Sequence, residues 1–201
     1  MTITTEKQLR ELYGWPQGRA KIKVLDRLEK HSRNFIQHSP FVVLGTYGQD
    51  GQSDTSPRGG QAGFVQVLDD QRLLIPDAKG NNRVDSLVNI VETGRLACLF
   101  LIPGIDETLR INGKASISIE EEYLARFADE KRPPKSVIVL EIEEVFLHCA
   151  KALMRSELWH DTYRQERPGF PTMGVMLNEQ LGMEKSTESQ EEMIRRYQAD
   201  L

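Results

Sequence analysis

The feature that most constrains this fold is a series of short β-type segments, running from Phe41 to about Leu147 and joined mostly by tight turns. Tight turns connect antiparallel strands, whereas neighbouring parallel strands need a crossover of a dozen or more residues. One helical segment, ending near Gly94, interrupts the series after the fourth strand. We therefore expect an antiparallel barrel or barrel-like sheet rather than a doubly wound parallel sheet.

Seven strands are predicted from runs of β-branched and aromatic residues bounded by turn signals. One of them alternates strictly, so that Arg110, Asn112 and Lys114 share a polar side, which is also the pattern of an ordinary solvent-facing strand. The predicted strands cover residues 41–47, 52–58, 63–68, 72–76, 95–102, 108–119 and 136–147.

Helical segments are expected at both ends of the chain. Apolar spacing predicts helices over residues 5–13, 20–37 and 120–129, and a helical tail over residues 149–201 with a break at 167–171. The whole is expected to form one structural domain. Its parts are an N-terminal helical segment packed on the barrel (1–40), the barrel (41–159) and a C-terminal helical extension (160–201).

Charge and composition exclude several classes of protein. The chain has 26 Lys and Arg against 30 Asp and Glu, which argues against a general nucleic-acid or anionic-membrane surface. It has no apolar run near the roughly 20 residues of a membrane span, and its first residues lack signal-peptide features, so we expect a cytoplasmic protein. Cys98 and Cys149 have neither zinc nor redox-pair spacing and are expected to be buried thiols, with no metal site.

A loop that could hold a phosphate follows the fourth predicted strand, at residues 75–86. It contains Lys79 and Arg83, and Asn81 or Asn82 is expected to cap the following helix. The unpaired N–H groups at a helix start, together with the positive end of its dipole, attract anions. The alternative is a solvated loop with an ordinary helix cap.

Two other segments carry cations in suggestive settings. Ser56 and Arg58 end a strand before a Gly-Gly pair, where Arg58 could bind a phosphate or carboxylate through two hydrogen bonds. Lys151, Arg155 and Trp159 are spaced to share one face of a helix. A hairpin turn with an exposed arginine and an amphipathic surface helix are the respective alternatives.

These segments together form a pattern that resembles the FMN-binding, pyridoxamine 5′-phosphate oxidase-related proteins of bacteria. The similarity extends from about Phe41 to Trp159, in the same order and spacing. The resemblance implies a mainly β fold with α additions, namely an antiparallel split β-barrel with N-terminal helices and a C-terminal helical tail. It also implies a homodimer with FMN at the subunit interface, where each site draws residues from both chains.

The resemblance further implies which residues bind the cofactor. Arg58 and Arg83 match positions that contact the FMN phosphate or ribityl chain, Thr108 falls at the position of a flavin-contacting glutamine, and Arg110 matches an arginine of the same strand. Lys79 and Asn82 are added from the chemistry of the local loop. The expected cofactor-binding residues are Ser56, Arg58, Lys79, Asn82, Arg83, Thr108, Arg110, Lys151, Arg155 and Trp159. No catalytic acid or base is assigned.

The leading functional hypothesis is an FMN-dependent oxidoreductase that transfers a hydride or electrons between the flavin and an unidentified small molecule, with NAD(P)H as a candidate donor. The sequence ends with residues 195–201 and lacks the final strand of the parent oxidases with its substrate-binding Arg-x-His segment, so we expect a substrate other than pyridoxamine phosphate. The alternatives are a non-catalytic FMN-binding or sensor protein, and a split barrel that binds a deazaflavin or haem, with His148 as the candidate haem ligand.

Overall fold

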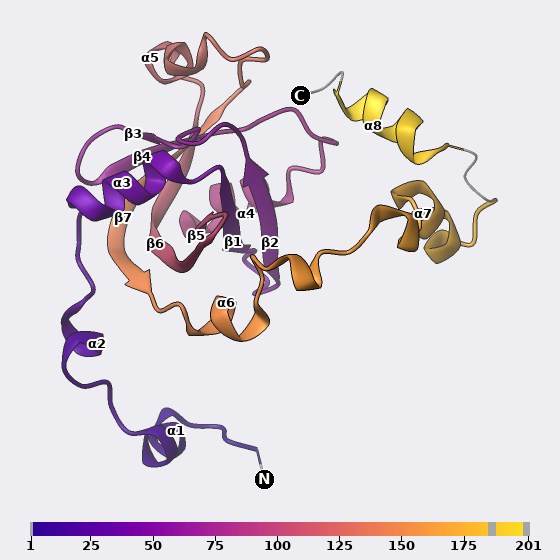
Figure 1. Ribbon diagram of the computed structural model, residues 1–201. Helices are drawn as coiled ribbons and strands as arrows, with labels where there is room; N and C mark the ends of the chain where they lie inside the picture. The colour runs from indigo at the N-terminus through magenta and orange to yellow at the C-terminus, as the bar shows by residue number, and fades with distance from the viewer. Residues whose placement is uncertain (1, 185–187, 199–201) are drawn as a thin grey trace.

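Seven antiparallel strands form one sheet in the order β2-β1-β5-β6-β7-β4-β3 (Figure 1). The structure is a computed structural model that describes residues 2–184 and 188–198. The predicted number of strands is confirmed, although β3 keeps only two residues because the preceding Gly63 has a φ of 82° and turns the chain. The strands are β1 (Phe41–Tyr47), β2 (Ser53–Gly59), β3 (Gln66–Val67), β4 (Arg72–Pro76), β5 (Arg95–Ile102), β6 (Ile105–Ser118) and β7 (Val137–His148).

The sheet curls into a split barrel, as the sequence predicts. Strands β2 and β4 lie far apart in the order of the sheet, yet Arg58 in β2 approaches Asp77, which directly follows β4, with 4.0 Å between Nη2 and Oδ1. No ladder joins β2 to β3 or β4 in the described part of the chain, so the barrel stays open at this seam.

The barrel interior is filled by alternate residues of the long strands. Val42, Phe100 and Leu109 lie beside one another across β1, β5 and β6, and all three are almost completely buried. Helix α4 (Asp85–Thr93) packs against β1 and buries Ile90 in the same core. This alternation leaves the residues on either side of each core residue on the outer face of the sheet.

The N-terminal segment differs from the predicted pair of helices. Helices α1 (Glu6–Tyr13), α2 (Arg19–Ile22) and α3 (Lys30–His38) are separate, so the single helix predicted over residues 20–37 is wrong. Leu25 instead forms an antiparallel bridge with Val145, with N–O distances of 3.0 and 2.8 Å, and this extended backbone interrupts the helix. A capping box centred on Glu29 then starts α3.

The C-terminal part of the chain leaves the barrel. Figure 1 shows it passing from α6 into an extended arm, here called the C-terminal arm (residues 160–184 and 188–198). The remaining elements are α5 (Glu121–Leu124) and η1 (Ala125–Phe127), which together replace the helix predicted over residues 120–129, then α6 (Lys151–Ser156), η2 (Asp161–Tyr163), η3 (Arg167–Gly169), α7 (Met173–Leu181) and α8 (Gln190–Gln198). The predicted tail includes residues 185–187 and 199–201, which lie outside the described residues.

Two further sequence expectations concern burial and membranes. Cys98 is buried in β5, as expected, but Cys149 is exposed because it lies in the turn between β7 and α6 rather than in the core. Across residues 2–184 and 188–198, no helix has the length and apolar character needed to cross a membrane.

Candidate functional site

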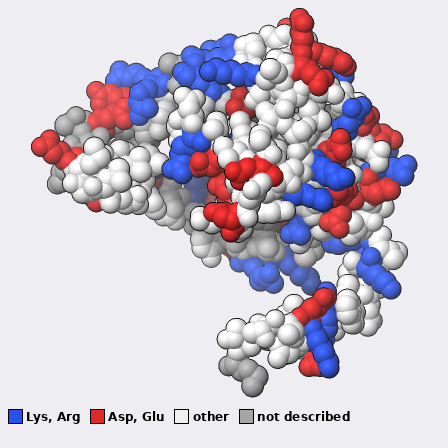
Figure 2. Space-filling view, turned by 180° about the vertical axis from the view of Figure 1, so that it is seen from behind, with Lys and Arg blue, Asp and Glu red and all other residues white. Residues whose placement is uncertain are grey.

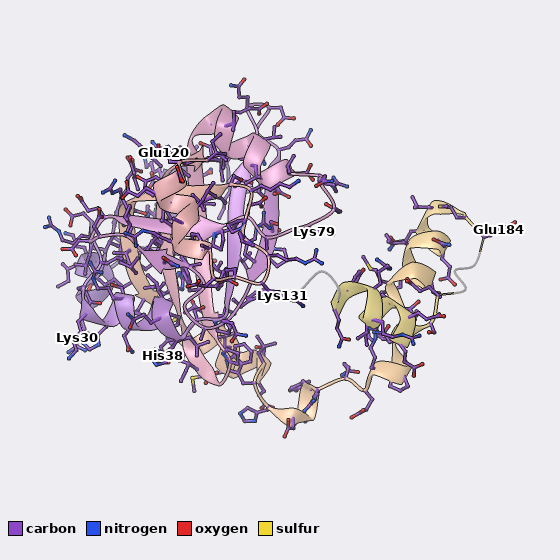
Figure 3. All side chains as sticks on the ribbon, turned by 90° about the horizontal axis from the view of Figure 1, so that it is seen from above. Lys30, His38, Lys79, Glu120, Lys131 and Glu184 are labelled. Atoms are coloured by element: carbon purple, nitrogen blue, oxygen red, sulfur yellow. The ribbon has the colours of Figure 1, made fainter. Side chains whose placement is uncertain are left out.

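A pocket of about 440 Å³ lies at the seam of the barrel, between β2, the loop that follows β4 and the start of α4. It brings together five of the predicted cofactor-binding residues, which come from segments more than 20 positions apart in the sequence. These residues are Ser56, Arg58, Lys79, Asn82 and Arg83. In Figure 3, Lys79 lies on a loop at the edge of the barrel, on the side toward the C-terminal arm.

Arg58 is the most enclosed cation of the pocket, with a side chain that is 19% exposed. Its Nη1 donates hydrogen bonds to Ser56 Oγ and to the carbonyl of Pro57. On its other side lies Asp77, whose pKa is raised by burial, an effect that the charge of Arg58 only partly offsets. The guanidinium is therefore held in place by its own strand and faces a partly buried carboxyl group.

The start of α4 forms the opposite wall of the pocket. The predicted cap by Asn81 or Asn82 is wrong, because the N-cap is Val84 and, among the described residues, no side chain caps the first backbone N–H groups of the helix. Asn81 instead accepts a hydrogen bond from the backbone N–H of Arg83 at 3.1 Å. Asn82 and Val84 both adopt left-handed backbone conformations, with φ of 62° and 51°. Such a conformation is strained for a β-branched valine, and strain of this kind clusters at ligand sites.

Arg83 projects from this wall with a side chain that is 74% exposed. Its Nε lies 2.8 Å from Asp85 Oδ2, so the cation has a carboxylate partner on its own loop. An exposed pair of this kind contributes little to stability. An anion in the pocket could therefore compete with Asp85 for Arg83 at small cost.

A buried polar network fixes the two walls relative to each other. Ser86 in α4 donates a hydrogen bond of 2.6 Å to Asp54 in β2. Asn89, one turn further along α4, donates to Thr46 Oγ1 at 3.0 Å, and Thr46 in turn lies 3.4 Å from Asp54. Ser86 and Thr46 are both buried. This network holds the start of α4 against the β1–β2 hairpin.

The other predicted residues lie elsewhere on the chain. Thr108 and Arg110 flank the core residue Leu109 in β6, so they occupy the outer face of the sheet, whereas Arg58 shares the inner side with Leu109. Three strand spacings, about 14 Å, separate β2 from β6. On this outer face Arg110 stacks over Phe146, with 5.5 Å from Cζ to the ring centroid.

Lys151, Arg155 and Trp159 belong to this second group but do not share one helical face. Helix α6 ends at Ser156, and Glu157 has a φ of 47°, which turns the chain before Trp159. The indole Nε1 instead donates to the carbonyl of Ile105 at 3.0 Å, at the start of β6. The prediction of one helix carrying all three residues is therefore wrong, although α6 packs against β6.

His148 is the neighbour of Thr108 on β7. Its pKa is lowered first by burial and then by the positive charges of Arg110 and Lys23. This environment favours a neutral imidazole at physiological pH.

Sequence reasoning missed all three carboxylates that line the pocket, Asp54, Asp77 and Asp85. Asp54 could have been found, because the alternation of a strand puts residues 54, 56 and 58 on one side. The proximity of Asp77 to Arg58 follows only from the curl of the sheet.

The sequence model of a known family, described as pyridoxamine 5′-phosphate oxidase, matches residues 28–149. The chain belongs to the pyridoxamine 5′-phosphate oxidase family. The matched residues include the whole sheet and the pocket, whereas α6 and the C-terminal arm lie beyond them.

Two solved structures are similar to this chain. HupZ from Group A Streptococcus is 18% identical, with a TM-score of 0.51 over 60% of this chain and 93% of that chain. A putative pyridoxamine 5′-phosphate oxidase from Lactobacillus delbrueckii is 22% identical, with a TM-score of 0.48 over 61% of this chain and 95% of that chain. No curated protein matches the chain at a significant level.

Proposed function

We propose that this chain is an FMN-dependent oxidoreductase, and that the pocket at the barrel seam binds the FMN phosphate. The observation that carries the proposal is the convergence of Arg58, Lys79 and Arg83 at the uncapped start of α4. A phosphate there would meet charged donors from two walls and backbone N–H groups that no side chain bonds.

The three carboxylates of the pocket are compatible with an anion. Asp54 accepts a hydrogen bond from Ser86, and Asp85 accepts one from Arg83. A phosphate could compete with Asp85 for Arg83. Burial raises the pKa of Asp77, and the charge of Arg58, 4.0 Å away, partly offsets this effect. The left-handed turn at Asn82 and Val84 directs the loop around the space where the phosphate would lie.

We further propose that each complete site forms between two copies of the chain. Arg58 lies on the inner side of the sheet, whereas Thr108 and Arg110 lie on the outer face and about three strand spacings away. One flavin could not readily contact both groups of the same chain. In a homodimer, the outer-face group (Thr108, Arg110, Lys151, Arg155 and Trp159) would complete the pocket of the partner.

FMN bound in this way supplies hydride or electron transfer, with a small molecule as the other reactant. The chain's own residues would hold the phosphate through Arg58 and Arg83, orient the ribityl chain beside Ser56 and Asn82, and exclude water with the partner's outer face. NAD(P)H is the candidate electron donor.

The decisive experiment is an absorbance spectrum of the purified protein followed by titration of the apoprotein with FMN. We expect a flavin spectrum, and we expect Arg58→Ala and Arg83→Ala each to weaken FMN binding by about 1.5–3 kcal/mol, the usual value of a hydrogen bond to a charged group. Arg27→Ala is the matched control, because Arg27 is exposed and pairs with its neighbour Asp26. A haem or deazaflavin spectrum, or unchanged affinity in both variants, would refute the proposed site.

Turnover separates an enzyme from a flavin-binding sensor. Anaerobic mixing of the FMN-loaded protein with NADPH or NADH, and then with an electron acceptor, should bleach and restore the flavin absorbance if the protein is an oxidoreductase. Two results together would favour the sensor. The oxidised flavin spectrum would stay unchanged when either nucleotide is added, and the spectrum of the chemically reduced protein would stay unchanged when a panel of acceptors is added.

A further inference from the structure

The C-terminal arm presents an apolar helix face that its own barrel does not cover. Helix α7 buries none of its nine residues, and Met173, Leu177 and Leu181 recur at intervals of four residues along one side. Leu181 is 68% exposed and Phe170, just before the helix, is 55% exposed. In Figure 2 the surface over α7, at the left edge of the view, is largely uncharged.

The arm has some internal structure of its own. Arg167 Nη2 donates to Gln190 Oε1 at 2.8 Å, which links the segment before α7 to α8, and Met193 of α8 is buried. The exposed apolar residues of α7 take no part in these contacts. A nine-residue helix is marginal in water without a surface to pack on, so the apolar face of α7 needs a partner.

We infer that α7 packs on the barrel of a second copy of this chain, so that each protomer of the dimer holds its partner with its C-terminal arm. The inference rests on the composite site of the proposed function. The arm begins next to α6 and Trp159, which lie against the start of β6 beside the outer-face residues Thr108 and Arg110. It then runs along the side of the barrel that carries Lys79, and stands apart from it (Figures 1 and 3).

This position makes a second copy the best occupant. The start of the C-terminal arm and the loop that carries Lys79 would both face the partner. A second copy of the chain between the barrel and the arm would therefore contact α7 and also complete the pocket. The barrel also offers exposed apolar residues to receive a helix, including Phe41 and Tyr47 on β1 and Val88 and Val91 on α4. Because a two-fold dimer repeats each contact, the dimer would contain two copies of the contact between α7 and the partner's barrel.

The first test compares two lysine substitutions on the same helix of the full-length protein. Leu177→Lys puts a charge in the apolar stripe, whereas Glu179→Lys puts it about half a turn away on the opposite side. In sedimentation experiments we expect Leu177→Lys to raise the dimer dissociation constant by about tenfold or more, the effect of losing one buried leucine per contact. Glu179→Lys should leave it within about twofold of the unchanged protein. Equal dissociation constants for both variants would overturn the inference.

The second test asks which chain the arm touches. A photo-cross-linking amino acid at position 181 is activated in a mixture of ¹⁵N-labelled and unlabelled protein, and the linked peptides are identified by mass. We expect cross-links between labelled and unlabelled chains that end on residues 41–148. Cross-links confined to single chains would overturn the inference. A membrane partner would also overturn the inference. In that case the unchanged protein would float with vesicles of anionic phospholipid, Leu177→Lys would not, and the dimer would be equally stable in both proteins.

FMN titration of the same variants separates this inference from the function. If Leu177→Lys dimerises like the unchanged protein and FMN binds normally, the arm contact is wrong and the composite site survives. If Leu177→Lys weakens the dimer and no variant binds FMN, the arm contact stands and the proposed cofactor is wrong.

Discussion

Gly113 is the position at which the structure predicts the largest effect of a single methyl group. A Cβ atom added here would lie 1.9 Å from the carbonyl oxygen of Glu141, 2.9 Å from its carbonyl carbon and 3.2 Å from the backbone nitrogen of Glu143. All three atoms belong to the backbone of β7, beside the bulge at which the β6–β7 register shifts, so none can rotate away. Overpacking usually costs about 1–3 kcal/mol, and we expect Gly113→Ala to lower the free energy of unfolding by about 3 kcal/mol.

Gly45→Ala provides the control for this prediction. Gly45 also lies in a strand, but its added Cβ would meet its nearest atoms, in Ala97, at 3.7 and 3.9 Å, which is ordinary contact. We expect its unfolding free energy to change by less than about 0.5 kcal/mol, or to rise, because alanine loses less entropy than glycine in a strand. Urea unfolding followed by circular dichroism measures both variants. With a slope of about 1–3 kcal/mol per molar, the Gly113→Ala midpoint should fall by about 1–3 M. Equal midpoints for the two variants would refute the close approach.

Three further variants or treatments test the site and its surroundings. Ser86→Ala should lower the free energy of unfolding by about 1.5–3 kcal/mol, measured by urea unfolding, because the buried hydrogen bond to the Asp54 carboxylate is lost. A colorimetric thiol reagent should titrate Cys149 in the native protein and Cys98 only after unfolding, because burial excludes the reagent and raises the pKa of the Cys98 thiol. Asp77→Asn should be more stable than the unchanged protein at pH 7. Burial raises the folded-state pKa of Asp77 above its ordinary value of 3.8, so the stability it contributes is present below that value and is lost as the pH rises through the folded-state pKa. The difference in urea midpoint should therefore shrink when the pH is lowered to about 4, and a constant difference would contradict the reasoning.

The strands were predictable because local alternation decides them. The bounds of β1, β4 and β5 agree with the prediction residue by residue. The side chains that point inward from these strands are apolar, except Thr46 in β1, and tight turns or the single inserted helix separate the strands from their neighbours. Those short connections indicate antiparallel pairing, so an antiparallel barrel or barrel-like sheet could be predicted from the residues alone. The split barrel was implied by the resemblance to a known family.

The errors arose where a distant segment decides the local structure. Residues 20–37 have helical spacing, but the backbone of Leu25 bonds to Val145, more than 100 positions away. Asn82 looks like a helix cap, but the loop takes a left-handed turn and leaves that position to Val84. The spacing of Lys151, Arg155 and Trp159 predicts one helix, yet α6 ends three residues before Trp159. The indole of Trp159 instead donates a hydrogen bond to the start of β6.

The candidate site was predictable as separate parts but not as one pocket. The sequence predicts Arg58 and Arg83 as candidate phosphate ligands in two unconnected segments. Their convergence depends on the curl of the whole sheet, which brings β2 to the end of β4. Conversely, the sequence could not show that Arg58 and Thr108 lie on opposite sides of the sheet, because that depends on the register of three strand pairs.

The register also explains why β2 carries the site. Its inward positions, Ser56 and Arg58, pair directly with Leu44 and Val42, which are completely buried. A strand selected only for stability would place apolar residues at those positions, because an inward-pointing charge must otherwise find a partner. Among the described residues, Arg58 contacts its own strand and the carboxyl group of Asp77, 4.0 Å away, whose pKa is raised by burial. An anion in the pocket would complete the contacts of this guanidinium, so the polar inward face of an edge strand is the feature that marks the candidate site.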